Sequence, residues 1–104
     1  MKHKIMSIYD AKAEAFLPLW TVPTEGIATR EFCNMAQNED SNVGAHPEDY
    51  ILYCLGEWSD KDCKMELHTP PKMVMHAMVA AGKDDILKDV DTAERLDSVE
   101  LKSI

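Results

Sequence analysis

The chain has 104 residues, of which 45% are hydrophobic, and its formal net charge is −8. This length fits one small domain that buries roughly 65% of the surface its unfolded chain exposes. An acidic surface repels phosphate over a Debye length, so nucleic-acid binding that relies on electrostatic attraction alone is disfavoured. Three cysteines without a C-x-x-C spacing predict no disulfide framework and a reducing cytoplasm. The first 20 residues carry five charges and no continuous apolar stretch, so we expect neither a signal peptide nor a membrane span.

The N-terminal part of the chain predicts two strands. Alternating residues indicate a first strand over residues 4–9, and a short polar connection leads to a second strand over residues 15–22. Pro18 removes a hydrogen-bond donor, which places this second strand at a sheet edge or at a bulge. Four of its residues are expected on one face of the sheet: Phe16, Pro18, Trp20 and Val22.

A helix is predicted next, from the N-cap Thr24 to about Gln37. Glu25 in its first turn suits the positive end of the helix dipole. Residues 38–46 have the composition of a loop, in which Gly44 is available for a positive φ. The helix carries one apolar stripe toward the core: Ala28, Phe32, Met35 and Ala36.

The longest apolar strand of the sequence organises the second half of the chain. It covers residues 50–58, directly after Pro47, and its composition suits the centre of a sheet. Residues 59–62 predict a tight hairpin into a fourth strand over residues 63–68. We expect the neighbours of the central strand to be this fourth strand and a strand of the N-terminal hairpin.

The segment after His68 leaves two alternatives open. Thr69-Pro70-Pro71 is expected to break the sheet and to start a second helix that stops at Gly82. A fifth strand over residues 73–79 competes with that helix. The predicted fold is therefore α+β: a single domain with an antiparallel four-stranded sheet in β-β-α-β-β order, one packed helix and a C-terminal helical segment.

The last 22 residues form an acidic tail. Residues 1–82 carry seven Lys or Arg against 12 Asp or Glu, and residues 83–104 carry four against seven, so −5 and −3 give the total of −8. We expect residues 1–82 to form the core domain and residues 83–104 to be an acidic tail that is helical or disordered. The tail is interpreted as a solvated face, or alternatively as a DNA mimic that occupies a basic groove.

Several short blocks carry a family resemblance. Over residues 4–68 the chain resembles the small nonstructural protein of gokushoviruses, which are microviruses with circular single-stranded DNA genomes. The most specific block is His46-Pro47-Glu48-Asp49-Tyr50, followed by Leu55-Gly56-Glu57-Trp58. The resemblance implies a phage protein of the host cytoplasm, absent from the virion, with a DNA-binding or replication-associated role and no catalytic residues. The other matching blocks are Ser7-Ile8-Tyr9-Asp10, Ala11-Lys12, Phe16-Leu17-Pro18 and Ala28-Thr29-Arg30-Glu31-Phe32.

Single-stranded DNA binding requires aromatic faces for base stacking and a few cations along the phosphate path. The candidate stacking residues are Tyr9, Trp20, Tyr53 and Trp58. The candidate phosphate contacts near strand ends are Lys4, Lys12, Lys61 and Lys64, with Lys2 and Lys72 beside them. Each aromatic also has the simpler interpretation of a core residue, and each lysine that of a solvated charge. A phage replication protein is the alternative partner in genome replication or packaging.

Other functions have weaker support in the sequence. The histidines and cysteines lack the i, i+4 or C-x-x-C spacing of structural zinc sites, so we expect no metal and no cofactor. Glu48 and Asp49 are adjacent on an extended segment and point to opposite faces, so no enzyme is predicted. The alternative to DNA binding is a protein-interaction adaptor, homodimeric or directed at a host protein, that uses apolar surface around Met73, Met75 and Met78.

Overall fold

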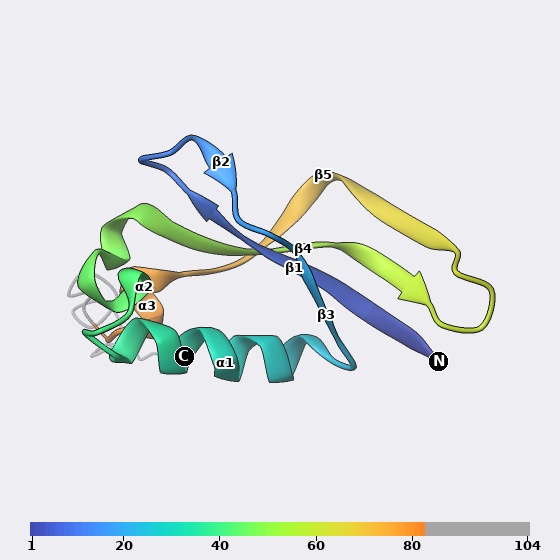
Figure 1. Ribbon diagram of the computed structural model, residues 1–104, viewed down its shortest axis with the longest axis horizontal. Coiled ribbons are helices and arrows are strands. Elements are labelled where there is room, and N and C mark those ends of the chain that lie inside the picture. The colour runs from blue at the N-terminus through green and yellow to red at the C-terminus, as the bar shows by residue number, and fades with distance from the viewer. Residues whose placement is uncertain (83–104) are drawn as a thin grey trace, which may run out of the picture.

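The computed structural model describes residues 1–82, which form an α+β domain with one antiparallel sheet and one long helix (Figure 1). The predictions for the tail, residues 83–104, lie outside the described residues. The strands are β1 (Lys2–Asp10), β2 (Ala15–Phe16), β3 (Trp20–Val22), β4 (Tyr50–Ser59) and β5 (Met65–His76). The helices are α1 (Glu25–Gln37), α2 (Asn42–Ala45), the 3₁₀ turn η1 (Pro47–Asp49) and α3 (Ala77–Ala80).

The sheet has the order β2-β1-β4-β5. β3 also pairs with β1, on the same edge as β2 but closer to the start of β1. The strand after Pro47 is therefore central, with β1 and β5 on its two sides, as predicted. Its residues alternate between buried and half-buried from Tyr50 to Gly56, which is the pattern of a strand covered fully on one face only. The prediction of burial on most of both faces is thus only half right.

The predicted second strand is interrupted. β2 pairs Phe16 with Tyr9, whereas β3 pairs Trp20 with Met6, so the register shifts by one residue between the two short strands. A shift of one residue moves side chains to the opposite face. Phe16 consequently lies on the face away from α1, and Trp20 lies on the α1 side. The break at Pro18 is the irregularity that the sequence indicated, but the prediction that Phe16 and Trp20 share a face is wrong.

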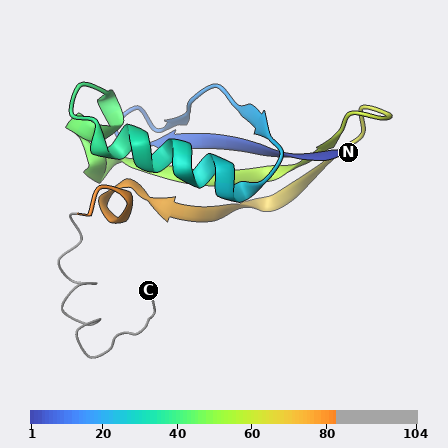
Figure 2. The same ribbon diagram turned by 90° about the horizontal axis from the view of Figure 1, so that it is seen from below.

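Helix α1 begins and ends where the sequence predicts. The Thr24 side chain accepts a hydrogen bond from the backbone N–H of Ile27 at 3.3 Å and so caps the first turn. Figure 2, seen from the helix side, shows α1 lying across the strands. Its apolar stripe packs on the sheet, and Phe32 is the largest side chain that is fully buried. Core residues contributed by the strands on this side include Met6, Ile8, Leu52 and Cys54.

The predicted loop after α1 contains the short helix α2, which Ser41 organises. The Ser41 hydroxyl donates to the Met35 carbonyl at 2.6 Å and accepts from the Gly44 N–H at 3.0 Å. Gly44 has no positive φ, contrary to the expectation. It is required for a different reason: a Cβ there would lie 1.9 Å from the carbonyl oxygen of Asn38.

The largest correction concerns β5. The chain does not break into a helix at Thr69; β5 continues through Pro70 and Pro71 to His76, and α3 has only four residues. Between Cys54↔Lys72 and Gly56↔Leu67, four residues of β5 stand opposite one residue of β4. This wide bulge takes the prolines out of the ladder, and because β5 is an edge strand their missing donors cost little. Gly82 ends α3 at φ 74°, as predicted for a helix stop.

Candidate functional site: the helix-free face of the sheet

Cross-strand pairing sorts the side chains of the sheet onto two faces. Residues directly opposite one another on neighbouring strands share a face. Ile8 and Leu52 belong to the core under α1, so their neighbours Ser7 and Tyr53 point away from it. We call this second side the open face. Its members are His3, Ile5, Ser7, Tyr9, Phe16, Thr21, Ile51, Tyr53, Gly56, Trp58, Met65, Leu67, Met73 and His76.

An aromatic cluster occupies one end of the open face. The ring of Phe16 lies 5.0 Å from that of Tyr9 and 5.4 Å from that of Tyr53, both in edge-on geometry. Under these rings lies Ser7, which is fully buried and donates its hydroxyl hydrogen to the Leu17 carbonyl at 2.7 Å. At the other end of the face the rings of His3 and Trp58 are 5.4 Å apart.

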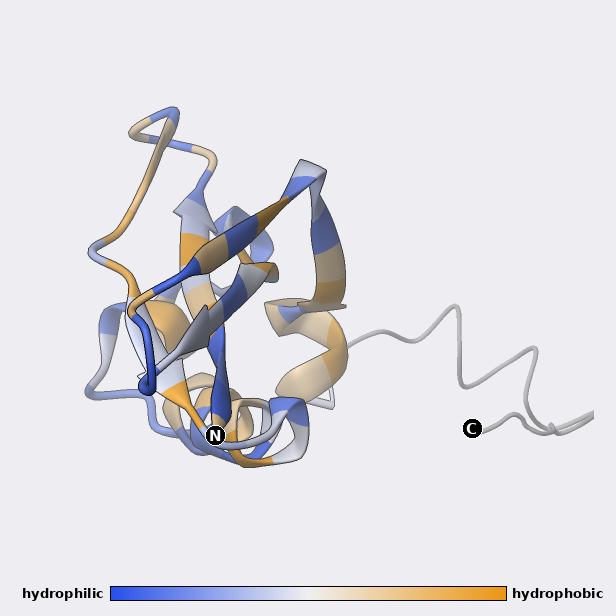
Figure 3. Ribbon diagram, turned by 90° about the vertical axis from the view of Figure 1, so that its right-hand side faces the viewer, coloured by the Kyte–Doolittle hydropathy of each residue, from blue (hydrophilic) through white to orange (hydrophobic). Residues whose placement is uncertain are grey.

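The outer strand gives the open face an exposed apolar strip. Met65, Leu67 and Met73 of β5 are 52%, 64% and 60% exposed. Phe16 of β2, on the same face but at the opposite edge of the sheet, is 45% exposed. Figure 3 shows hydrophobic and hydrophilic stretches alternating along the strands, as expected when the two faces differ. None of the paired positions on this face, within residues 1–82, holds Lys, Arg, Asp or Glu.

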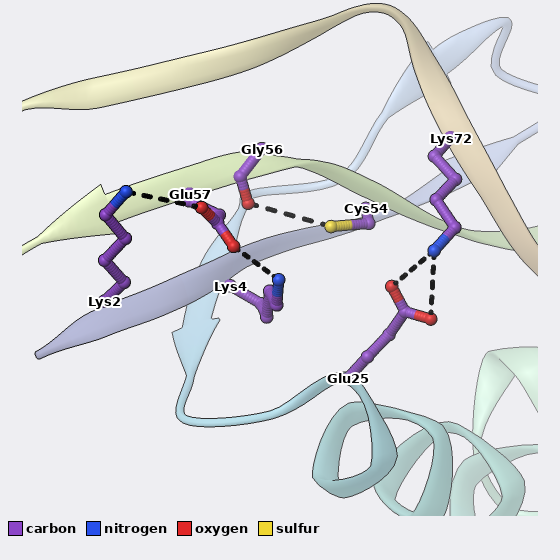
Figure 4. Close-up of polar contacts among 7 residues, drawn as sticks. All are labelled: Lys2, Lys4, Glu25, Cys54, Gly56, Glu57 and Lys72. Atoms are coloured by element: carbon purple, nitrogen blue, oxygen red, sulfur yellow. Dashed lines mark hydrogen bonds and ion pairs between the residues drawn. The ribbon is translucent and has the colours of Figure 1, made fainter.

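The charged side chains of the strands point to the α1 side instead. The Lys4 ammonium donates to the Glu57 carboxylate, and Lys2 Nζ lies 4.0 Å from the same residue (Figure 4). The hydrogen bond with Lys4 lowers the pKa of Glu57 and raises that of Lys4. Near the start of α1, Lys72 Nζ lies 3.2 Å from the Glu25 carboxylate (Figure 4). Lysines on this side therefore have carboxylate partners.

The predicted stacking residues do not all come together. Tyr9, Tyr53 and Trp58 are on the open face, but Trp20 is on the α1 side, where its indole N–H donates to Glu31 at 3.2 Å. Phe16 lies on the open face in place of Trp20, although it was not among the predicted stacking residues. The signal that could have found it is Pro18, because an interruption there permits the change of register.

The predicted phosphate contacts lie at both ends of the sheet. Lys4 is on the α1 side with Glu57. Lys12 is in the turn after β1, and Lys61 is in the turn between β4 and β5, at the opposite end. Lys64 lines a polar hollow of about 240 Å³ on the hairpin, together with Lys2, Glu57, Ser59, Asp62 and Glu66.

Across residues 1–82, no three His, Cys, Asp or Glu side chains are grouped so that they could hold a metal ion. Cys54 is buried, with its Sγ 3.7 Å from the Gly56 carbonyl, whereas Cys63 is exposed in the hairpin. Over the same range, no helix has the length and apolarity needed to cross a membrane.

Within residues 1–82, the fold is that of a small α+β protein with one sheet face covered by α1 and a second face whose paired positions hold no Lys, Arg, Asp or Glu. Residues 3–80 match the family described as Phage ORF5 protein, and the chain belongs to this phage protein family. No curated protein matches the chain. No solved structure matches it either.

Proposed function

We propose that this phage protein acts by binding rather than by catalysis, and that the open face is its binding surface. The observation that carries the proposal is the combination of Met65, Leu67 and Met73 at more than half exposure with the lack of charge at the paired positions of that face, within residues 1–82. Several exposed apolar side chains on one face are typical of protein-interaction sites. Methionine adds adaptable contacts because its side chain is unbranched.

The biological setting follows from the resemblance to the gokushovirus nonstructural protein. We propose that the chain works in the cytoplasm of the infected host, in the replication or packaging programme of a single-stranded DNA phage. Docking onto a protein surface suits an uncharged face, whereas phosphate recognition requires cations close to the stacking rings. Protein docking is therefore the function that the geometry favours.

The experiment is complementation of a phage that lacks this gene, with phage yield as the measurement. Leu67→Lys and Met73→Lys place a charge on exposed positions of the open face, so both variants should fold and yet reduce the yield at least tenfold. Glu66→Gln is the matched control, since it changes the net charge by the same +1 on the adjacent, α1-side position. Full yield from both lysine variants, with wild-type circular dichroism, would contradict the proposal.

Single-stranded DNA binding is the second candidate, and a specific observation favours it. Three aromatic rings, Tyr9, Phe16 and Tyr53, cluster on the open face, and Lys12 and Lys61 lie in turns at its two ends. The two lysines lie beyond opposite ends of β1, whose nine residues span roughly 27 Å. A short stretch of extended single-stranded DNA could bridge this distance.

Fluorescence anisotropy of a labelled oligonucleotide, at two salt concentrations, separates the two functions. Base stacking on this face predicts an affinity that falls as salt rises and a loss of about 1–3 kcal/mol in Tyr53→Ala. Trp20→Phe, on the other side of the sheet, is the control and should bind like the wild type. Absence of salt-dependent binding in the full chain would rule out the DNA function and leave protein docking.

A further inference from the structure

We infer that the occupant of the open face is a second copy of this chain, so that two sheets pack face to face with the α1 helices outside. This inference rests on the proposed function, because it names the partner of the same face. Three features of the molecule support it: its charge, the edges of its sheet and the area of the open face.

Charge favours this one face for self-association. Each copy carries a net charge of −8, so contacts through most of its surface bring like charges together. The open face is the exception, since none of its paired positions within residues 1–82 holds Lys, Arg, Asp or Glu. The Asp60 carboxylate, which lies 3.0 Å from His3 Nε2 at one end of the face, is also paired with the N-terminal ammonium of its own chain at 2.8 Å. A two-fold contact also needs one self-complementary patch, and an uncharged apolar patch meets that condition.

Both edges of the sheet are unsuited to strand addition. Pro18 separates β2 from β3 on one edge, and Pro70 and Pro71 lie in the bulge of β5 on the other. Proline offers no N–H donor, and bulges twist an edge away from a partner strand, which are common means of blocking edge-to-edge pairing. A second copy is therefore directed to the face of the sheet.

The area is sufficient for a specific contact. Four strand positions at about 4.8 Å spacing and seven residues at about 3.4 Å give a flat area of roughly 450 Å² per copy. Protruding side chains increase the accessible area, so two copies bury on the order of 1,000 Å², where specific interfaces begin. The predicted dimer is consequently one of modest affinity, sensitive to single changes.

Sedimentation equilibrium of the full-length protein over a range of concentrations tests the inference. The wild type should move from the monomer mass of 11.7 kDa toward twice that value, and association should strengthen with salt, because salt screens the repulsion between acidic copies. Leu67→Lys and Met73→Lys should each raise the dissociation constant at least tenfold, since every substitution enters the dimer twice. Glu66→Gln should leave it within twofold of the wild type.

A second measurement uses Trp58, which lies on the open face, whereas Trp20 does not. In a Trp20→Phe protein, the emission of Trp58 should shift to shorter wavelength as dimer forms. A wild type that stays monomeric at high concentration would overturn the inference, and so would a dimer that both lysine variants retain. If the wild type is monomeric but the lysine variants still fail in phage complementation, the second copy is wrong while the binding function stands. If the lysine variants lose the dimer without any loss of phage yield, the second copy is right but the proposed binding function of the open face is wrong.

Discussion

The ring of Phe16 on β2 lies 5.4 Å from the ring of Tyr53 on β4, although β1 runs between these two strands. Strands two places apart in a sheet are about 9.6 Å apart, so the rings have to lean over β1 to meet. The position on β1 opposite Tyr53 is Ser7, whose small side chain leaves the necessary room. Its hydroxyl also donates a hydrogen bond to the carbonyl of Leu17, which lies in the segment between β2 and β3.

Ser7→Ala should lower the free energy of unfolding by about 1–2 kcal/mol, because it removes the hydrogen bond between the fully buried Ser7 side chain and the Leu17 carbonyl. Ser7→Leu should cost more and should also separate the rings, since a larger side chain occupies the space under them. Urea denaturation measures both changes. Ser59→Ala, on β4 near the hairpin, is the control: it removes only an exposed hydrogen bond from the Lys61 N–H, at 3.3 Å, and should stay within about 0.5 kcal/mol of the wild type. Equal effects at the two serines would contradict this role for Ser7.

Gly56 lies where the backbone of β4 approaches that of β5 closely. Its φ is +156°, and a Cβ built there would lie 2.1 Å from the backbone oxygen of Glu66. Gly56→Ala should therefore destabilise the domain by more than about 2 kcal/mol, because backbone has to move. Gly26→Ala is the matched control: a Cβ there has only the Thr24 hydroxyl oxygen nearby, at 3.9 Å. That variant should be neutral or up to about 1 kcal/mol more stable. Thermal unfolding of the two proteins should separate them by several degrees.

The sequence predicted the elements whose local signals agree with their surroundings. Thr24 caps α1, and Pro47 precedes the central strand, because each residue has the backbone preference that its position needs. β5 was the failure. Pro70 and Pro71 normally end a strand, but here a bulge of four residues removes them from the ladder on an edge strand. Sequence alone does not reveal that a strand is at the edge of its sheet.

The candidate site was predictable only in part, for a related reason. Tyr9 and Tyr53, two of the candidate stacking residues, share the open face because β1 and β4 keep their register in that region. Trp20 was assigned to the wrong face because one extra residue after Phe16 reverses the alternation. The lack of charge on the open face emerges only from the pairing of three strands. Lys4 and Glu57 are 53 residues apart in the sequence, and nothing local indicates that they meet.

Ser41 holds the connection between α1 and α2 through its hydroxyl group. The single hydroxyl hydrogen is shared between the carbonyls of Met35, at 2.6 Å, and Asn38, at 2.9 Å, and the oxygen accepts from the Gly44 N–H. Ser41→Ala removes the N-cap of α2 and should cost about 1–2 kcal/mol in urea denaturation. Thr21→Ala, exposed on β3, is a suitable comparison and should have a smaller effect. A cost below that of Thr21→Ala would show that the Ser41 contacts contribute little.

The Lys4–Glu57 pair gives the domain a stability that depends on pH. The Lys4 hydrogen bond lowers the pKa of Glu57, so an unfolded chain, in which glutamate titrates at about 4.3, binds this proton more readily than the folded protein. The contribution of Glu57 is therefore fully present above that value and is lost as the pH falls through the lower folded pKa. At the alkaline end the pKa of Lys4 is raised, so its contribution persists until the pH exceeds the folded value.

Glu57→Gln should consequently be less stable than the wild type at pH 7, and the difference should shrink as the pH is lowered from 5 to 3. Urea denaturation at each pH measures the two free energies of unfolding. High salt should reduce the difference at pH 7, because the pair is partly exposed and its charges are screened. Glu14→Gln, in the exposed β1–β2 turn, should follow the wild type throughout. A gap between Glu57→Gln and the wild type that is constant from pH 7 to pH 3 would show that the carboxylate does not contribute through its ionised form.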